Sequence, residues 1–237
     1  MGRMELIGMP LSPFVKKCEA VLHEKGITFQ FRQISPLIDQ DQYFEHSPTG
    51  KMPILRDGDF ALPDSSAIAA YLDEIVAEPR LIPTDPKQRA WVIWLEEYSD
   101  SVLLPLSSGL FFARFIGPRL MGLPVDEEGA AAILANVMPP AFDYLEAQLD
   151  ASGDYLAPSG YSLADISVAA QICMMRLAGE SIDAERWPML AAWFERVCER
   201  PAFQKCLAEE ARFFDIWQNT DEFSPADGSA AARQLGR

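Results

Sequence analysis

The chain has 237 residues, enough for one large or two small domains, and its 49% of hydrophobic residues is ordinary for a globular protein. Its net charge of −15 argues against binding to nucleic acids or anionic membranes, because both partners require clustered Lys and Arg. The four cysteines and two histidines show neither disulfide nor metal-ligand spacing, and no signal peptide or membrane span is visible, so we expect a cytoplasmic protein without a metal.

The first third of the chain alternates strand and helix patterns. A short apolar run at residues 6–9 predicts a buried strand, and apolar residues then recur at helical spacing from 14 to 22. Alternating residues 27–32 predict a second strand, and Asp57-Gly58-Asp59 predicts the turn of a hairpin. We therefore expect an α/β domain over residues 1–78, with a small mixed sheet and helices on both of its faces.

The rest of the chain is predicted to be helical. Three prolines within eight residues make residues 79–88 a linker, since proline cannot continue a helix. Helical periodicity through residues 89–217 indicates an all-helical domain, in which the segment SLAD at 162–165 forms a capping box and gives Asp165 a role in folding. The polar tail at 218–237, rich in Ala, Gly and Ser, is expected to be disordered.

The most informative segment joins the first strand to the first helix. Ser12 stands at the expected N-cap of the helix and Pro13 at its first position. A hydroxyl and free backbone N–H groups then meet at the positive end of the helix dipole, where an anion such as a thiolate is stabilised. A cysteine here would be a redox thiol. The serine indicates a site for the thiolate of another molecule, although a plain N-cap has the same pattern.

Four segments, taken in order, carry a resemblance to a known family. They are SPFVKK (12–17) with EKGI (24–27), SPTGKMPIL (47–55), DSSAI (64–68) with YL (71–72), and SLAD (162–165) with the stretch 187–201. Together they resemble the cytosolic glutathione S-transferase family, in its bacterial form with a serine in the active site, over nearly the whole chain. Each segment alone is a weak signal, but their order and spacing are specific.

The resemblance implies a thioredoxin-like N-terminal domain that binds glutathione, followed by an all-helical C-terminal domain. In this family the Met52–Pro53 bond is cis, and the backbone of Met52 meets glutathione as a strand would. Lys51 is placed for the glycyl carboxylate, and Asp64 with Ser65 for the γ-glutamyl carboxylate. Asp64 departs from the glutamate that is usual in the family.

The resemblance also implies the chemistry. Ser12 would donate a hydrogen bond to the glutathione sulfur and favour its thiolate, which then adds to an apolar electrophile. The family binds this second substrate between its domains, and the apolar stretch 103–123 is either a wall of that pocket or helix core. Arg114 and Arg119 are candidate partners for an acidic group of the substrate. The candidate side chains of the pocket are Phe14, Phe111, Phe112 and Phe115.

Two other functions remain open. A non-catalytic interaction protein on the same scaffold, like stringent starvation protein A, would not need the glutathione contacts, which residues 12, 51, 53 and 65 retain. A ligandin-like carrier would bind apolar compounds without turnover. The family further implies a homodimer, for which the apolar stripe at residues 91–98 is either an interface or intrachain core.

Overall fold

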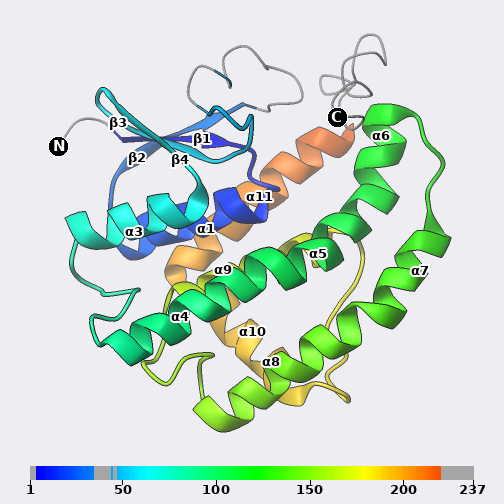
Figure 1. Ribbon diagram of the computed structural model, residues 1–237. Coiled ribbons are helices and arrows are strands. Elements are labelled where there is room, and N and C mark those ends of the chain that lie inside the picture. Colours follow the sequence, from blue (N-terminus) through cyan, green and yellow to red (C-terminus); the bar gives the residue numbers. More distant parts are fainter. Residues whose placement is uncertain (1–3, 35–43, 45–46, 220–237) are drawn as a thin grey trace. The chain divides into compact units, whose positions relative to one another are not determined.

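The computed structural model describes residues 4–34, 44 and 47–219 (Figure 1). The chain forms two compact units: residues up to Pro79 together with the chain from Pro201 onward, and Arg80–Arg200. The first unit contains the sheet, and the regular elements of the second are all helical. The predicted fold class, an α/β domain followed by an all-helical one, is confirmed.

The first unit is built on a four-stranded mixed sheet with the strand order β2-β1-β3-β4. β1 runs parallel to β2 and antiparallel to β3, and the predicted hairpin joins β3 to β4 through Gly58, whose φ of 62° suits glycine. Buried Leu6 and Leu55 lie opposite each other in the central pair. The strands are β1 (Met4–Gly8), β2 (Phe29–Gln33), β3 (Ile54–Asp57) and β4 (Phe60–Pro63).

Helix α1 (Pro13–Glu24) is the central helix of this unit, and it packs against both α3 (Ser65–Ile75) and α11 (Pro201–Asn219). Figure 1 shows α1 and α3 side by side on one face of the sheet. Most of the segment between β2 and β3 falls outside the described residues, so the expectation of helices on both faces of the sheet is not tested there.

The position of α11 differs from the domain boundaries expected from the sequence, which place residues 89–217 in one helical domain. In the structure α11 packs on α1, and fully buried Lys16 of α1 forms an ion pair of 2.7 Å with Glu210 of α11. Helical periodicity shows which face of a helix is buried but not what covers it, so the sequence could not reveal this partner. The tail predicted from residue 218 lies outside the described residues from residue 220 on.

The second unit contains one long helical run, Pro86–Met121, which begins inside the predicted linker with Asp85 as its N-cap. Wide π-helical turns interrupt it at η1 and η2. By length and composition alone this run could cross a membrane, as core helices of soluble proteins also could; here α4 and α5 pack against α9. The elements are α4 (Pro86–Tyr98), η1 (Ser99–Leu103), α5 (Leu104–Phe111), η2 (Phe112–Ile116), α6 (Gly117–Met121), α7 (Glu127–Asn136), α8 (Met138–Ser152), α9 (Leu163–Leu177) and α10 (Pro188–Cys198).

The predicted capping box at the start of α9 is confirmed, and its aspartate does more than cap the helix. Asp165 is fully buried, and its Oδ2 accepts hydrogen bonds from the N–H (2.9 Å) and the hydroxyl (3.1 Å) of Ser162. Its Oδ1 accepts from the N–H of Leu156 (3.0 Å) and from Nε1 of Trp193 (2.8 Å). Burial raises the pKa of Asp165, while these four donors act in the opposite direction. Asp165 therefore joins α9, α10 and the loop before α9.

Candidate active site

Ser12 is the N-cap of α1, as the sequence predicts. Its backbone is extended (φ −73°, ψ 127°), and its hydroxyl oxygen accepts a hydrogen bond of 3.5 Å from the N–H of Val15. Its own N–H donates to the carbonyl of Met9 at 3.0 Å, which closes the turn between β1 and α1. Accepting a bond does not use the hydroxyl proton, and the residue is partly exposed. The geometry therefore suits donation to a bound anion.

Gly8 allows three segments to meet at the end of β1. A Cβ atom built on Gly8 would lie only 2.5 Å from Cγ2 of Val15 and 3.6 Å from Cβ of Met52. The end of β1, the first turn of α1 and the residue before Pro53 are therefore neighbours around one glycine. Sequence reasoning missed Gly8, although a glycine that ends an apolar run is a signal of close backbone approach.

We expect Gly8→Ala to lower the free energy of unfolding by about 1–3 kcal/mol, because the added methyl group overlaps Val15 and must displace it. Denaturant unfolding of both proteins measures this loss. Val15→Ala supplies the control, since it removes the overlapping methyl group: in that background Gly8→Ala should cost less. If the stability losses of Gly8→Ala and Val15→Ala simply added in the double variant, overlap with Val15 would not be the cause of the loss in Gly8→Ala.

The loop before β3 has the form that the family resemblance implies. The Met52–Pro53 peptide bond is cis, as expected. Buried Ser47 shapes the loop: its hydroxyl donates to the carbonyl of Lys51 at 3.0 Å, and its carbonyl accepts from the N–H of Gly50 at 2.9 Å. Pro53 is buried, Met52 half-buried and Lys51 exposed. The loop thus fixes the backbone on either side of Lys51 and leaves the lysine side chain in solvent.

Asp64 caps α3, and among the described residues it is the only non-glycine residue with a positive φ, at 78°. Its Oδ1 accepts hydrogen bonds from the N–H groups of Ser66 and Ala67, both at 3.0 Å. An aspartate can thus replace the usual glutamate as a cap. Left-handed backbone at a residue with a Cβ is costly and is typical of functional sites. It places buried Ser65 at the first position of the helix.

These pieces of the predicted glutathione site lie around α1. Met52 is beside Gly8 and Val15, within the turn that Ser12 caps. One turn further, Sγ of Cys18 is 3.6 Å from the carbonyl oxygen of Ser65. The structure therefore brings the N-terminus of α1, the loop with the cis bond and the N-terminus of α3 into one neighbourhood of the first unit.

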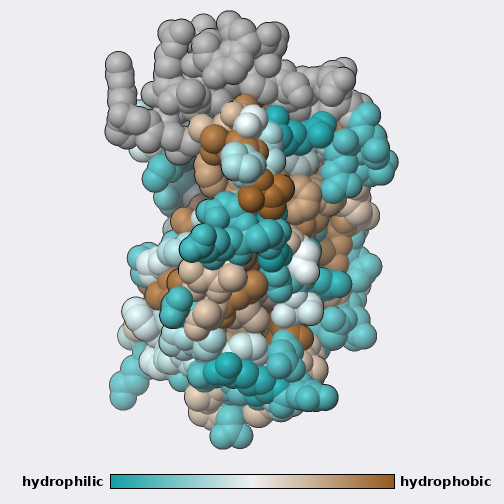
Figure 2. Space-filling view, turned by 90° about the vertical axis from the view of Figure 1, so that its right-hand side faces the viewer, coloured by the Kyte–Doolittle hydropathy of each residue, from teal (hydrophilic) through white to brown (hydrophobic). Residues whose placement is uncertain are grey.

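The four candidate aromatic side chains come from both units, and each unit is described by itself. Phe14 lies in the first turn of α1, half-buried, with Nζ of Lys17 5.5 Å from its ring centroid. In the helical unit, Phe111 is buried and stacks on Phe115 with centroids 5.4 Å apart, whereas Phe112 is exposed. Hydrophobic (brown) and hydrophilic (teal) residues are interspersed over the face of the molecule drawn in Figure 2. Phe111 fits the core alternative, and a substrate contact by Phe112 or Phe115 stays a prediction.

Arg114 has hydrogen-bond partners within its own unit, and its contact with a substrate stays a prediction. Its Nη1 donates to the carboxylate of Glu180 at 2.6 Å and to the carbonyl of Ala178 at 2.7 Å. Its Nη2 donates to Glu127 at 3.1 Å. The hydrogen bonds to these two carboxylates raise the pKa of Arg114, that of Glu180 most strongly. Arg114 therefore links η2 to α7 and to the end of α9.

Comparison with known proteins agrees with this arrangement. Residues 6–80 match the family model of the glutathione S-transferase N-terminal domain, and residues 128–196 match that of the C-terminal domain. Glutathione S-transferase 3 of Zea mays is 33% identical over 215 residues, which cover 88% of this chain and 95% of the relative. Glutathione S-transferase Z2 of Arabidopsis thaliana is 30% identical over 214 residues, with coverages of 88% and 92%.

The same likeness extends to solved structures. A glutathione S-transferase from Rhodospirillum rubrum F11 superposes with a TM-score of 0.79 at 25% identity, over 86% of this chain and 91% of that chain. Both family models, full-length relatives and a solved structure thus agree on one family. The chain belongs to the glutathione S-transferase family.

Proposed function

We propose that this protein is a serine-type glutathione transferase, which holds glutathione as its thiolate through Ser12 and adds it to an apolar electrophile. The observation that carries the proposal is the hydroxyl of Ser12: it caps α1, retains its proton for donation and lies in the turn beside Met52. A donor at the positive end of a helix dipole favours the anionic sulfur.

The rest of the tripeptide is proposed to bind along the same neighbourhood. Its cysteinyl backbone pairs with the backbone of Met52, next to the cis bond. Its γ-glutamyl carboxylate lies at the N-terminus of α3, where Ser65 supplies a hydroxyl and an N–H. Its glycyl carboxylate meets the exposed ammonium group of Lys51.

In the proposed reaction the thiol proton is released to water and the sulfur lone pair forms a bond to an electrophilic carbon. With an aryl halide the halide ion leaves. With an epoxide the ring opens and its oxygen takes a proton from water, and with an isothiocyanate the nitrogen takes that proton. Disulfide exchange is disfavoured, because a serine cannot form the mixed disulfide that a cysteine at position 12 would form. We also propose a cytoplasmic homodimer, and the exposed side chains of Trp91, Ile93 and Trp94 on α4 support an interface there.

The test combines calorimetric binding of glutathione with turnover assays on aryl halides, epoxides and isothiocyanates. We expect saturable binding and turnover with at least one class. Ser65→Ala should weaken glutathione binding by about 10- to 100-fold, because a hydrogen bond to a charged group is lost. Ser101→Ala, an exposed serine whose hydroxyl bonds to the carbonyl of Glu97, is the matched control and should bind normally.

The outcomes separate the competing functions. Folded protein that does not bind glutathione would contradict the proposal and favour an interaction protein. Tight binding of apolar dyes without turnover would favour a carrier. Equal affinities of Ser65→Ala and the unchanged protein would remove Ser65 from the site while leaving the reaction open.

A further inference from the structure

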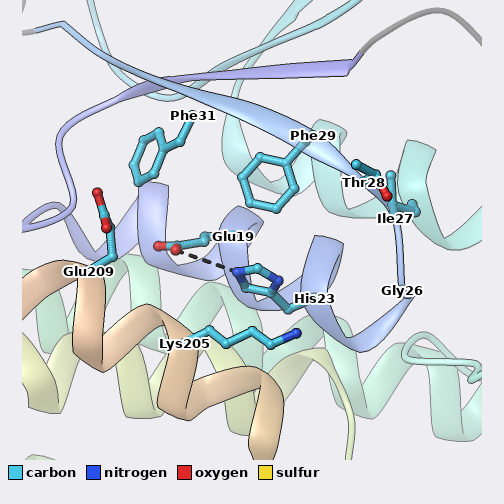
Figure 3. A pocket seen from close by; sticks show the side chains of 9 residues that line it. All are labelled: Glu19, His23, Gly26, Ile27, Thr28, Phe29, Phe31, Lys205 and Glu209. Atoms are coloured by element: carbon cyan, nitrogen blue, oxygen red, sulfur yellow. Dashed lines mark ion pairs between the residues drawn. The ribbon is translucent and has the colours of Figure 1, made fainter.

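A concave region of the first unit lies away from Ser12, toward the C-terminal end of α1. It is a cavity of about 540 Å³ between α1, β2 and α11. Figure 3 shows Glu19 and His23 pointing toward each other beneath Phe29 and Phe31 of β2, with Lys205 and Glu209 of α11 on the opposite side. The proposed transferase chemistry uses none of these groups.

Two residues that line this cavity, Glu19 and His23, and the buried Cys206 next to them have the chemistry of metal ligands. Glu19 and His23 are four residues apart on α1 and therefore share one face of that helix. Cys206 faces them from α11, and one ligand atom from each of the three lies within 4.8 Å of the others. Oε1 of Glu19 is 3.7 Å from Nε2 of His23, whose ring packs on Phe29 with centroids 5.2 Å apart.

One carboxylate oxygen of buried Glu19 has no hydrogen-bond partner among the described residues. The residue is only 2% exposed, and the oxygen is Oε2. A buried carboxylate oxygen without a partner costs free energy. Cys206 is also fully buried, and its thiol contacts the carbonyl of Ala202 in its own helix at 3.5 Å. A cation between these side chains would satisfy the carboxylate and the sulfur together.

The charges and ligand types define the class of ion. A carboxylate and a thiolate neutralise a divalent ion, and neutral imidazole completes three protein ligands. Sulfur and nitrogen ligands favour zinc-class ions over Mg²⁺ and Ca²⁺. His23 lies in the last turn of α1, where the helix dipole favours a cation. Two lysines nearby carry positive charge, which disfavours a bound cation. Lys16 is already paired with Glu210 at 2.7 Å, and Lys205 lines the cavity.

We propose that Glu19, His23 and Cys206 bind one divalent ion of the zinc class, with a fourth position open to the cavity. On binding, the sulfur forms a bond to the metal and the thiol proton is released to water. The ion would join α1 to α11 and so stabilise the first unit. Because the ligands come from opposite ends of the chain, the sequence shows no metal-ligand spacing.

The experiment titrates the chelator-treated full chain with Co²⁺ and then displaces the Co²⁺ with Zn²⁺. We expect one ion per chain and an intense sulfur-to-cobalt charge-transfer band that Zn²⁺ abolishes. Cys206→Ser should lose the band, and Glu19→Gln and His23→Gln should weaken metal binding by about 10-fold or more. Cys198→Ser, which alters a buried cysteine of the helical unit, is the matched control and should keep the band.

Thermal unfolding supplies a second measurement. Zn²⁺ should raise the midpoint of the unchanged protein and of Cys198→Ser, and at the same Zn²⁺ concentration it should raise that of His23→Gln less. His23 is partly exposed, so this variant keeps the proposal testable if Cys206→Ser does not fold. The proposal would be overturned if the unchanged protein showed no sulfur-to-cobalt band, or if Cys206→Ser kept that band. It would also be overturned if His23→Gln bound the metal as tightly as the unchanged protein.

Discussion

Replacing Asp165 by alanine is expected to lower the free energy of unfolding by about 3–5 kcal/mol, the loss typical of a broken buried charged network. The carboxylate accepts four hydrogen bonds, and the substitution leaves all four donors buried without it. The loss is a large fraction of the total stability of a protein, which is commonly about 5–15 kcal/mol. Denaturant unfolding measures the difference between the two proteins.

Two further variants make this prediction specific. Asp165→Asn keeps one acceptor oxygen and should lose less stability than Asp165→Ala. Asp154→Ala removes a carboxylate whose side chain is 81% exposed and should change stability by less than about 1 kcal/mol. If Asp165→Ala does not fold at all, Asp165→Asn still provides a measurable value. A cost for Asp165→Ala as small as that for Asp154→Ala would show that the network contributes little.

Replacing Ser12 by alanine is expected to lower kcat by about 10- to 1,000-fold, the range for loss of one preorganised donor at a developing or bound anion. Affinity for glutathione should change little, because the tripeptide keeps its other proposed contacts. The pKa of the bound thiol should rise toward that of a free thiol, about 8.5, so the ascending limb of the pH–rate profile should move to higher pH. Steady-state kinetics over a range of pH measures both effects.

The cap at Ser12 requires a control. The hydroxyl also accepts from Val15, so Ser12→Ala should cost about 1 kcal/mol of stability in addition to turnover. Ser12→Thr keeps a hydroxyl for both roles and should retain most of the activity. Ser12→Cys should gain glutathione-dependent disulfide reduction. Unchanged turnover in Ser12→Ala would remove this residue from the mechanism.

The features predicted correctly from the sequence are those with short-range causes. Ser12 as an N-cap, the hairpin at Gly58 and the capping box of Asp165 each depend on a few neighbouring residues. The cis bond at Pro53 came from the family resemblance and not from the residues themselves.

The features that were missed depend on contacts between distant parts of the chain. The sequence does not reveal that Glu180 and Glu127 bind Arg114 in the fold. Gly8 has its role only because Val15 and Met52 converge on it. Likewise, no local pattern indicates that Cys206 faces Glu19 and His23. Pattern reasoning finds the buried positions, but it does not identify their partners.

The packing of α11 on α1 has a consequence for how the chain folds during synthesis. The helical unit is contiguous, whereas the sheet-containing unit is interrupted by all of Arg80–Arg200. As the ribosome releases the chain, the helical unit can form as soon as its own residues have emerged. The sheet-containing unit cannot be completed until α11 has left the exit tunnel. Until then, the face of α1 that packs on α11 stays uncovered. A fragment ending before Pro201 would therefore carry an exposed apolar surface and is expected to aggregate.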